Sequence, residues 1–301
     1  MLRVVRKKVI DAWVAAGKST ELHIQVQVGG APLADVTELV GGAPLADVTE
    51  LVSSVALLNA EGRDLPAAGK STGLHIQVQV GGAPLADVTE LARYCQQAGA
   101  DSLLTLPELY FKPASVQDLV FYVSQVAKAA PKLPVLYYHI PAMSKVEIHM
   151  PSFVAAATVT IPNFKGIKFT SNDLSEGAQV LRTLKEGQEM FLGADTLLAP
   201  AALLGIKSSI GTSFNLFPKL AQEILDAVDR NEVDKARALQ EKLSLAIEAH
   251  TCEGPWVPIM KAGMEIATGI KVGPPSLPQR PLSAEAKLRI QSKLRTLGLS
   301  K

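Results

Sequence analysis

The sequence predicts an α/β fold with a mainly parallel sheet. An α/β barrel is the most economical arrangement, and an open doubly wound sheet is the alternative. From residue 92 onward, short apolar segments rich in β-forming residues alternate with amphipathic helical stretches, which is the pattern of βαβ units. The chain has 301 residues, 48% hydrophobic and 20% charged, which suits one large α/β domain or two modest ones.

Composition narrows the functional classes. The formal net charge of +1 gives no support for nucleic acid or an anionic membrane as the main partner. The two cysteines, Cys95 and Cys252, offer no disulfide framework. The sequence contains no uncharged apolar run of about 18 residues, so no transmembrane helix is expected. Residues 1–16 are basic and could mimic a transit peptide, but their apolar residues fit one face of an ordinary helix. We therefore expect a cytoplasmic protein.

The first ninety residues contain a duplication. Residues 15–39 recur at 67–91 with a single change, Glu21 against Gly73, and a partial copy occupies 41–52. Solenoid repeats share a pattern rather than identity, and they recur at regular spacing. A recent duplication or an assembly fault therefore explains these copies better than a repeat architecture.

Each full copy includes a GKST segment that invites a phosphate-loop interpretation. A phosphate loop needs a glycine five residues before its Gly-Lys pair, a strand before it and a helix after it. Ala12 and Asp64 occupy the two glycine positions, and a predicted strand follows each copy, at 22–28 and 74–80. The sequence therefore argues against nucleotide binding by this element.

The remaining elements follow in order. The predicted strands after the duplication are 101–109, 133–140, 164–169, 189–195 and 207–214. An apolar stripe begins at Val116, and Ser115 and Asp118 form an N-terminal cap for that helix. After residue 215 the chain is predicted to be helical, with a last helix over 283–297.

These elements divide the chain into three regions. Residues 1–66 form a rearranged N-terminal segment, 67–215 the barrel core and 216–301 a C-terminal helical region. A further short strand is predicted at 54–58, so this strand and the one at 22–28 could substitute for a missing strand pair.

A lysine, Lys168, interrupts the apolar strand 164–169. Lysine is among the residues least often buried in such a strand without a reason. An amine held away from water favours its neutral form, and a neutral amine can attack a carbonyl to form a Schiff base. On this stretch alone, a strand-end lysine whose amine reaches solvent is the simpler interpretation.

Other polar residues also fall at strand ends. Tyr138, His139, Asp195 and Thr212 each lie near the end of a predicted strand. In a barrel these ends share one rim, where catalytic groups gather. Alternation places Gly166 on the same side as Lys168, where it would leave room for a substrate, and places Tyr138 opposite His139.

Each of these residues also has an ordinary structural explanation. Tyr138 could be a core tyrosine, Asp195 a helix cap and Thr212 a turn hydroxyl. All of these explanations would have to hold at matching strand ends. A shared site around Lys168 is therefore the stronger hypothesis.

Four motifs, in order and at these separations, carry a resemblance to a known family. They are YYHIPAM at 137–143, GIKFTSND at 166–173, FLGADTLL at 191–198 and GTSFN at 211–215. Together they resemble the N-acetylneuraminate lyases, most closely the animal form, within the dihydrodipicolinate synthase-like class I aldolases. The resemblance covers about residues 67–301.

The resemblance implies a (β/α)8 barrel with extra C-terminal helices, usually a homotetramer, acting on a 2-keto acid such as sialic acid. It implies that Lys168 forms the Schiff base and that Tyr138 relays the proton. Gly193, Asp195 and Thr212 correspond to residues that bind the polyol part of the sugar, and Thr196 lies beside them. It implies no metal and no organic cofactor.

The chain also differs from its relatives. No arginine follows Pro141 closely, which favours the lyase over the synthase branch. Thr196 stands where family lyases carry glutamate, and the GT[ST]GE loop that holds the pyruvate carboxylate is absent from these 301 residues. Impaired activity is therefore expected. Two alternatives remain: a sibling aldolase for another 2-keto acid, or an inactive barrel that acts as a binding or oligomerising subunit.

Overall fold

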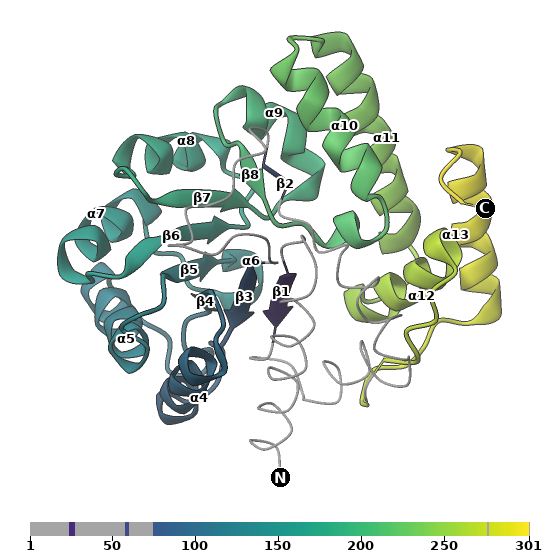
Figure 1. Cartoon of the computed structure of the whole chain (residues 1–301). Helices are drawn as coiled ribbons and strands as arrows, with labels where there is room; N and C mark the ends of the chain where they lie inside the picture. Colours follow the sequence, from purple (N-terminus) through teal and green to yellow (C-terminus); the bar gives the residue numbers. More distant parts are fainter. Residues whose placement is uncertain (1–23, 28–57, 60–74, 276, 301) are drawn as a thin grey trace.

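The computed structural model describes residues 24–27, 58–59, 75–275 and 277–300 (Figure 1). The strands in these residues form one eight-stranded sheet in the order β1-β3-β4-β5-β6-β7-β8-β2. The strands are β1 (Ile24–Gln27), β2 (Leu58–Asn59), β3 (Ile76–Gln79), β4 (Ser102–Thr105), β5 (Val135–His139), β6 (Phe164–Phe169), β7 (Glu189–Leu192) and β8 (Ser208–Ser209).

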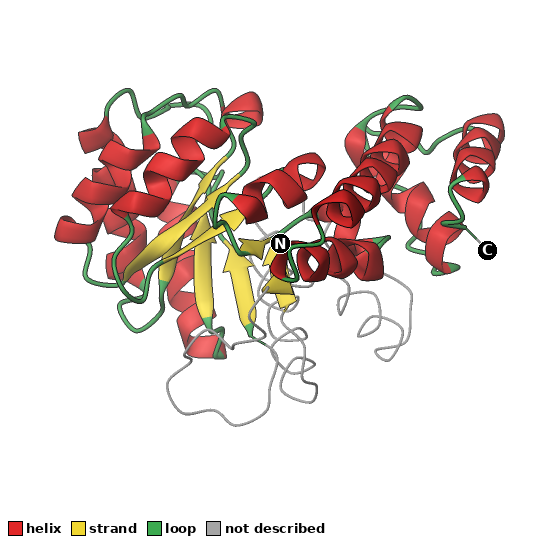
Figure 2. Ribbon diagram, turned by 90° about the horizontal axis from the view of Figure 1, so that it is seen from above, coloured by secondary structure: helices red, strands yellow, loops and turns green. Residues whose placement is uncertain are grey.

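The sheet is parallel from β1 through β8, and β2 alone runs antiparallel, beside β8. It is curved, with helices packed against its outer side (Figures 1 and 2). The prediction of an α/β fold with a mainly parallel sheet is confirmed. The segment predicted as a strand at 22–28 contains β1, whereas β2 shares only Leu58 with the strand predicted at 54–58. These two strands occupy the two ends of the strand order.

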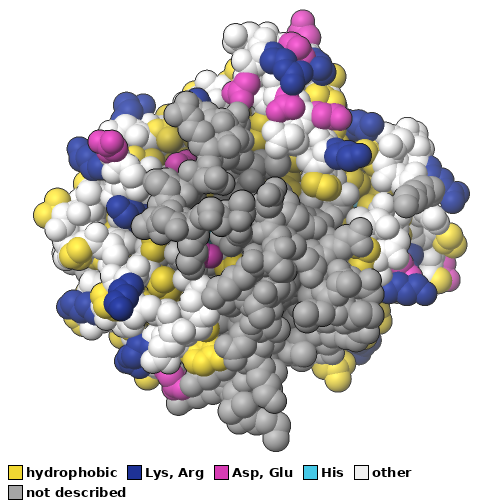
Figure 3. Space-filling view, in the orientation of Figure 1, with side chains coloured by type: hydrophobic (Ala, Val, Ile, Leu, Met, Phe, Trp, Pro, Cys, Tyr) yellow, Lys and Arg dark blue, Asp and Glu magenta, His cyan; other side chains and the backbone are white. Residues whose placement is uncertain are grey.

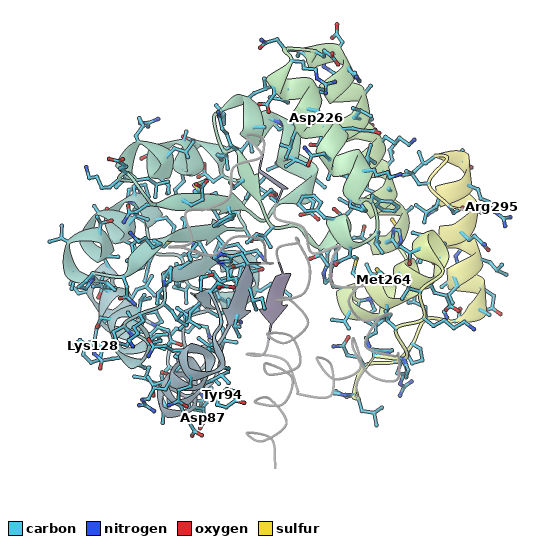
Figure 4. The ribbon with its side chains drawn as sticks, viewed as in Figure 1. Asp87, Tyr94, Lys128, Asp226, Met264 and Arg295 are labelled. Atoms are coloured by element: carbon cyan, nitrogen blue, oxygen red, sulfur yellow. The ribbon has the colours of Figure 1, made fainter. Side chains whose placement is uncertain are left out.

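The helices divide into two groups. The first alternates with the strands: α4 (Leu85–Ala98), α5 (Val116–Ala129), α6 (Pro141–Ser144), α7 (Met150–Thr160), α8 (Leu174–Thr183) and α9 (Leu198–Leu203). The second follows the last strand: α10 (Pro218–Asp229), α11 (Val233–Thr251), α12 (Trp256–Thr268) and α13 (Ala284–Thr296). Asp87 on α4 and Arg295 on α13 mark opposite sides of the molecule (Figure 4). The predicted helical region after residue 215 is confirmed.

The cap predicted for α5 is present. The Ser115 hydroxyl accepts a hydrogen bond from the Asp118 backbone N–H at 3.1 Å and donates to the Asp118 carboxylate at 2.7 Å. A cap of this kind stabilises a helix by about 1 kcal/mol because it satisfies an otherwise unpaired donor.

Several of the predicted strands are too long. The strand predicted at 189–195 ends at Leu192, so Asp195 lies in a 3₁₀ turn after the strand and not at its end. The strand predicted at 101–109 ends at Thr105, close before Pro107, which lacks a backbone N–H for the ladder. The strand predicted at 207–214 ends at Ser209, and a 3₁₀ turn, η2 (Thr212–Asn215), follows. The Asp195 carboxylate holds this turn through hydrogen bonds from Ser213.

Alternation along the strands separates two apolar clusters. Side chains on the outer face pack against the helices in the main core. A smaller cluster occupies the inner face, formed by Leu104, Leu106, Leu136, Tyr138, Phe191 and Ile210. Tyr138 and its strand neighbours therefore point away from the helices.

The structure gives a different reason for Gly166 than room for a substrate. Its φ of +129° belongs to the region that favours glycine, and a Cβ at this position would collide with the Glu189 carbonyl of β7. Gly166 therefore allows β6 and β7 to approach each other.

The described surface carries charges of both signs, in several separate places on the face in Figure 3. Within the described residues, every helix is too short or too polar to cross a membrane. Both cysteines are free thiols, Cys95 in the core and Cys252 at the surface. The predicted N-terminal helix and both GKST segments lie outside the described residues.

Candidate active site

The structure brings Lys168 and Tyr138 together. They are register partners on the neighbouring parallel strands β6 and β5, so their side chains leave the same face of the sheet at the same level. The Lys168 Nζ lies 4.3 Å from the centroid of the Tyr138 ring. Both side chains are buried, with 7% of Lys168 and 9% of Tyr138 exposed. A lysine amine held among inner-face side chains, next to a phenol, is suited to carbonyl chemistry.

Gly193 lies directly after β7, beside this lysine. A Cβ at Gly193 would lie 3.3 Å from the Lys168 Cε and would collide with the Thr170 hydroxyl. Any larger residue at Gly193 would therefore fill the space next to the lysine side chain.

Asp195 begins the 3₁₀ turn η1 (Asp195–Leu197), and its carboxylate is buried. One carboxylate oxygen, Oδ2, accepts hydrogen bonds from the Ser213 backbone N–H at 2.8 Å and from the Ser213 hydroxyl at 2.5 Å. Burial raises the pKa of Asp195, while the Ser213 hydrogen bonds and the positive charge of Lys168 act in the opposite direction. Asp195 thus connects η1 to η2 and lies within electrostatic reach of Lys168.

Thr196 and Thr212 lie on the two turns that this link joins. Thr196 is the second residue of η1 and Thr212 the first of η2, and both are exposed. Because Asp195 and Ser213 are bonded, the neighbouring threonines are held on adjacent turns. Their hydroxyls can contact a ligand without losing a buried partner.

The structure places His139 away from this site. Its ring stacks on Phe169 on the outer face of the sheet, with centroids 5.3 Å apart. Burial lowers its pKa to about 4. The prediction that Tyr138 and His139 face opposite sides is therefore confirmed.

Sequence reasoning missed two residues of the site region. Ser213 binds Asp195 although only Thr212 was singled out from the GTSFN motif. At Gly211, a Cβ would collide with the Asp195 carboxylate, so this glycine lets the two turns approach. Both residues belong to the GTSFN motif. The position of this motif, at the end of the strand after Asp195, was the sequence signal that could have indicated their contact with Asp195.

Within the described part of the chain, His, Cys, Asp and Glu side chains do not form a group of three or more that could hold a metal. The groups that act on Lys168 include the Tyr138 ring and the buried Asp195 carboxylate.

The fold and these residues define a class of protein, a parallel α/β protein with a buried lysine paired to a tyrosine near the ends of adjacent strands. The chain belongs to the dihydrodipicolinate synthetase family, whose sequence profile matches residues 70–297. The family resemblance predicted from the sequence is therefore confirmed.

Two relatives of this chain are named N-acetylneuraminate lyase. The chain is 32% identical over 234 residues to N-acetylneuraminate lyase of Gallus gallus, covering 76% of this chain and 75% of that protein. It is 30% identical over 207 residues to N-acetylneuraminate lyase of Mus musculus, covering 68% of this chain. That second match spans 65% of the mouse protein, slightly less than two thirds of its length.

Solved structures agree with this assignment. The N-acetylneuraminate lyase (sialic acid aldolase) of Aliivibrio salmonicida superposes with a TM-score of 0.76 at 26% identity, covering 99% of this chain and 92% of that one. The Proteus mirabilis N-acetylneuraminate lyase gives a TM-score of 0.74 at 26% identity, with the same coverage of both chains.

Proposed function

We propose that this protein is a class I aldolase that reversibly cleaves N-acetylneuraminate to N-acetylmannosamine and pyruvate. The observation that carries the proposal is the pair formed by the buried Lys168 amine and the Tyr138 ring, 4.3 Å apart. The names of the relatives in Gallus gallus and Mus musculus support the choice of substrate.

In the proposed mechanism, the Lys168 amine attacks the ketone carbon of the open-chain sugar acid. Loss of water leaves an iminium that can accept an electron pair. The Tyr138 oxygen then removes the proton from the hydroxyl on the carbon β to the iminium carbon. The carbon–carbon bond breaks, the aldehyde N-acetylmannosamine leaves, and the electron pair enters the iminium to give an enamine. Protonation of the enamine and addition of water release pyruvate and restore the lysine.

The polyol part of the sugar is proposed to lie along the two turns after β7 and β8. Gly193 leaves space beside Lys168, and the exposed Thr196 and Thr212 offer hydroxyl groups. The segment after Pro141 forms the short helix α6 and contains no arginine for a second carboxylate, which favours the lyase over the synthase reaction. The mechanism requires no metal or organic cofactor.

We extend the proposal to the whole molecule. The curved sheet and its structural neighbours support closure into a TIM barrel, with residues 1–66 as a rearranged segment, 67–215 as the barrel core and 216–301 as the helical region. The expected assembly is a homotetramer in the cytoplasm.

We propose that this chain cleaves N-acetylneuraminate slowly. Its 301 residues contain no GT[ST]GE segment, the motif expected to hold the pyruvate carboxylate. Lys168 would then form the Schiff base with a weakly anchored substrate.

Borohydride reduction in the presence of pyruvate tests the proposal. Reduction converts an iminium into a stable secondary amine, so mass spectrometry should find the adduct on Lys168. The matched control is Lys165, an exposed lysine on the same strand. Lys165→Met should leave the adduct intact and Lys168→Met should abolish it.

An adduct with other 2-keto acids but not with N-acetylneuraminate would favour the sibling aldolase. The absence of any adduct would favour an inactive subunit and overturn the proposal.

A further inference from the structure

Gln240 connects a helix outside the sheet to the turn that carries Asp195. It lies on α11, and only 9% of the residue is exposed. Its side-chain Oε1 accepts a hydrogen bond from the Ala199 backbone N–H at 2.8 Å. Its Nε2 donates to the Asp195 backbone carbonyl at 3.2 Å. One amide therefore satisfies both ends of the segment 195–199.

The same segment is held from the other side through the Asp195 carboxylate. That carboxylate accepts two hydrogen bonds from Ser213 in η2. Gln240 therefore fixes the backbone of Asp195 while Ser213 fixes its side chain. A residue constrained at both its backbone and its carboxylate has little freedom to move the neighbouring Thr196 or Thr212.

Packing alone does not explain a glutamine at this position. A buried amide must have its donor and acceptor satisfied, so an apolar side chain of similar size would be simpler if only volume mattered. Here the acceptor and one donor are used by two backbone groups of one turn. The remaining amide contact, to the Ser244 hydroxyl at 3.4 Å, lies within α11 itself.

We infer that Gln240 is a positioning residue that sets the geometry of the sugar-binding turns from the C-terminal helical region. The effect on sugar binding rests on the proposed function, which assigns Thr196 and Thr212 to the sugar. The coupling of α11 to both turns through Asp195 does not depend on catalytic activity. Gln240 touches no substrate atom in this scheme and acts through Asp195.

Hydrogen exchange tests the coupling directly. Gln240→Leu removes both hydrogen bonds at nearly constant volume, so peptides covering 195–199 and 211–215 should exchange faster, by roughly 10-fold. The second peptide is the critical one because the hydrogen bonds of Gln240 go to Asp195, Ala199 and Ser244 and not to this peptide. A peptide covering β5 at 135–139 should not change.

The matched control is Gln188→Leu. Gln188 is a part-buried glutamine directly before β7, at the opposite end of that strand from η1. Its side chain accepts a hydrogen bond from the Lys185 backbone N–H and donates one to the Thr158 hydroxyl on α7. Its loss should leave both site peptides unchanged. Faster exchange at 195–199 alone would reduce Gln240 to a cap for α9 and overturn the inference. A uniform increase that includes β5 would also overturn it, since Gln240 would then support only global stability.

Kinetics provide the second readout. In Gln240→Leu the KM for N-acetylneuraminate should rise by roughly 10-fold, while the rate of borohydride trapping with pyruvate at Lys168 stays unchanged. An equal loss in trapping would contradict a role confined to the sugar-binding turns. If the unmodified protein forms no adduct at all, the proposed function fails, and the exchange experiment still decides whether Gln240 positions the turns.

Discussion

The Lys168 amine lies 4.3 Å from the centre of the Tyr138 ring because the two residues are register partners on adjacent parallel strands. Strand pairing therefore fixes their relative position, and no loop has to order to bring them together. A site built on paired strands holds its geometry better than one built on loops.

Tyr138→Phe should separate Schiff-base formation from cleavage. The ring remains beside Lys168, but the oxygen that takes the sugar hydroxyl proton is lost. We expect the rate of carbon–carbon cleavage to fall by roughly 10² to 10⁴. Trapping of pyruvate on Lys168 should persist. Single-turnover cleavage and borohydride trapping on the same samples measure both. Undiminished cleavage in this variant would remove Tyr138 from the mechanism.

Gly193→Ala should block the space beside Lys168. The new Cβ would collide with the Thr170 hydroxyl and press against the Lys168 Cε. We expect lower substrate affinity and slower trapping, with the strands of the sheet retained. Gly187→Ala is a control because Gly187 is exposed and only the Lys165 amine lies within 4 Å of the added Cβ. Its φ of +75° predicts a small loss of stability in this control. Trapping at the unmodified rate in Gly193→Ala would show that the space is not used.

The positions of Lys168 and Tyr138 could be predicted because period-two alternation and strand ends are visible in the sequence. The links that hold the turns could not. Ser213 binds Asp195 across 18 residues, and Gln240 reaches the same residue across 45. Contacts at such separations depend on how helices pack onto the sheet, which no local pattern records. The role of Gly166 was likewise hidden, since it depends on the backbone of β7.

Gly166→Ala should lower the stability of the folded protein, in addition to any effect on catalysis. Alanine is strained at a φ of +129°, and its Cβ would collide with the Glu189 carbonyl. We expect the free energy of unfolding to fall by about 2 kcal/mol or more, measured by urea denaturation. The control is Gly298→Ala, at a positive φ of +65° with open space around it. Equal losses in the two variants would show that backbone strain alone, without the contact to β7, explains the effect.

Acid should destabilise the protein between about pH 6.5 and pH 4 through His139. Its folded-state pKa is lowered to about 4 by burial, whereas the unfolded chain binds the proton near pH 6.5. The unfolded state therefore holds more protons in this window, and stability falls as the pH falls. The shift corresponds to about 3 kcal/mol at most. His250, whose pKa is also lowered by burial, acts in the same direction. His139→Gln should flatten the pH dependence of the urea midpoint, while His149→Gln, at an exposed histidine, should leave it steep. An unchanged slope in His139→Gln would mean that other groups control the acid response.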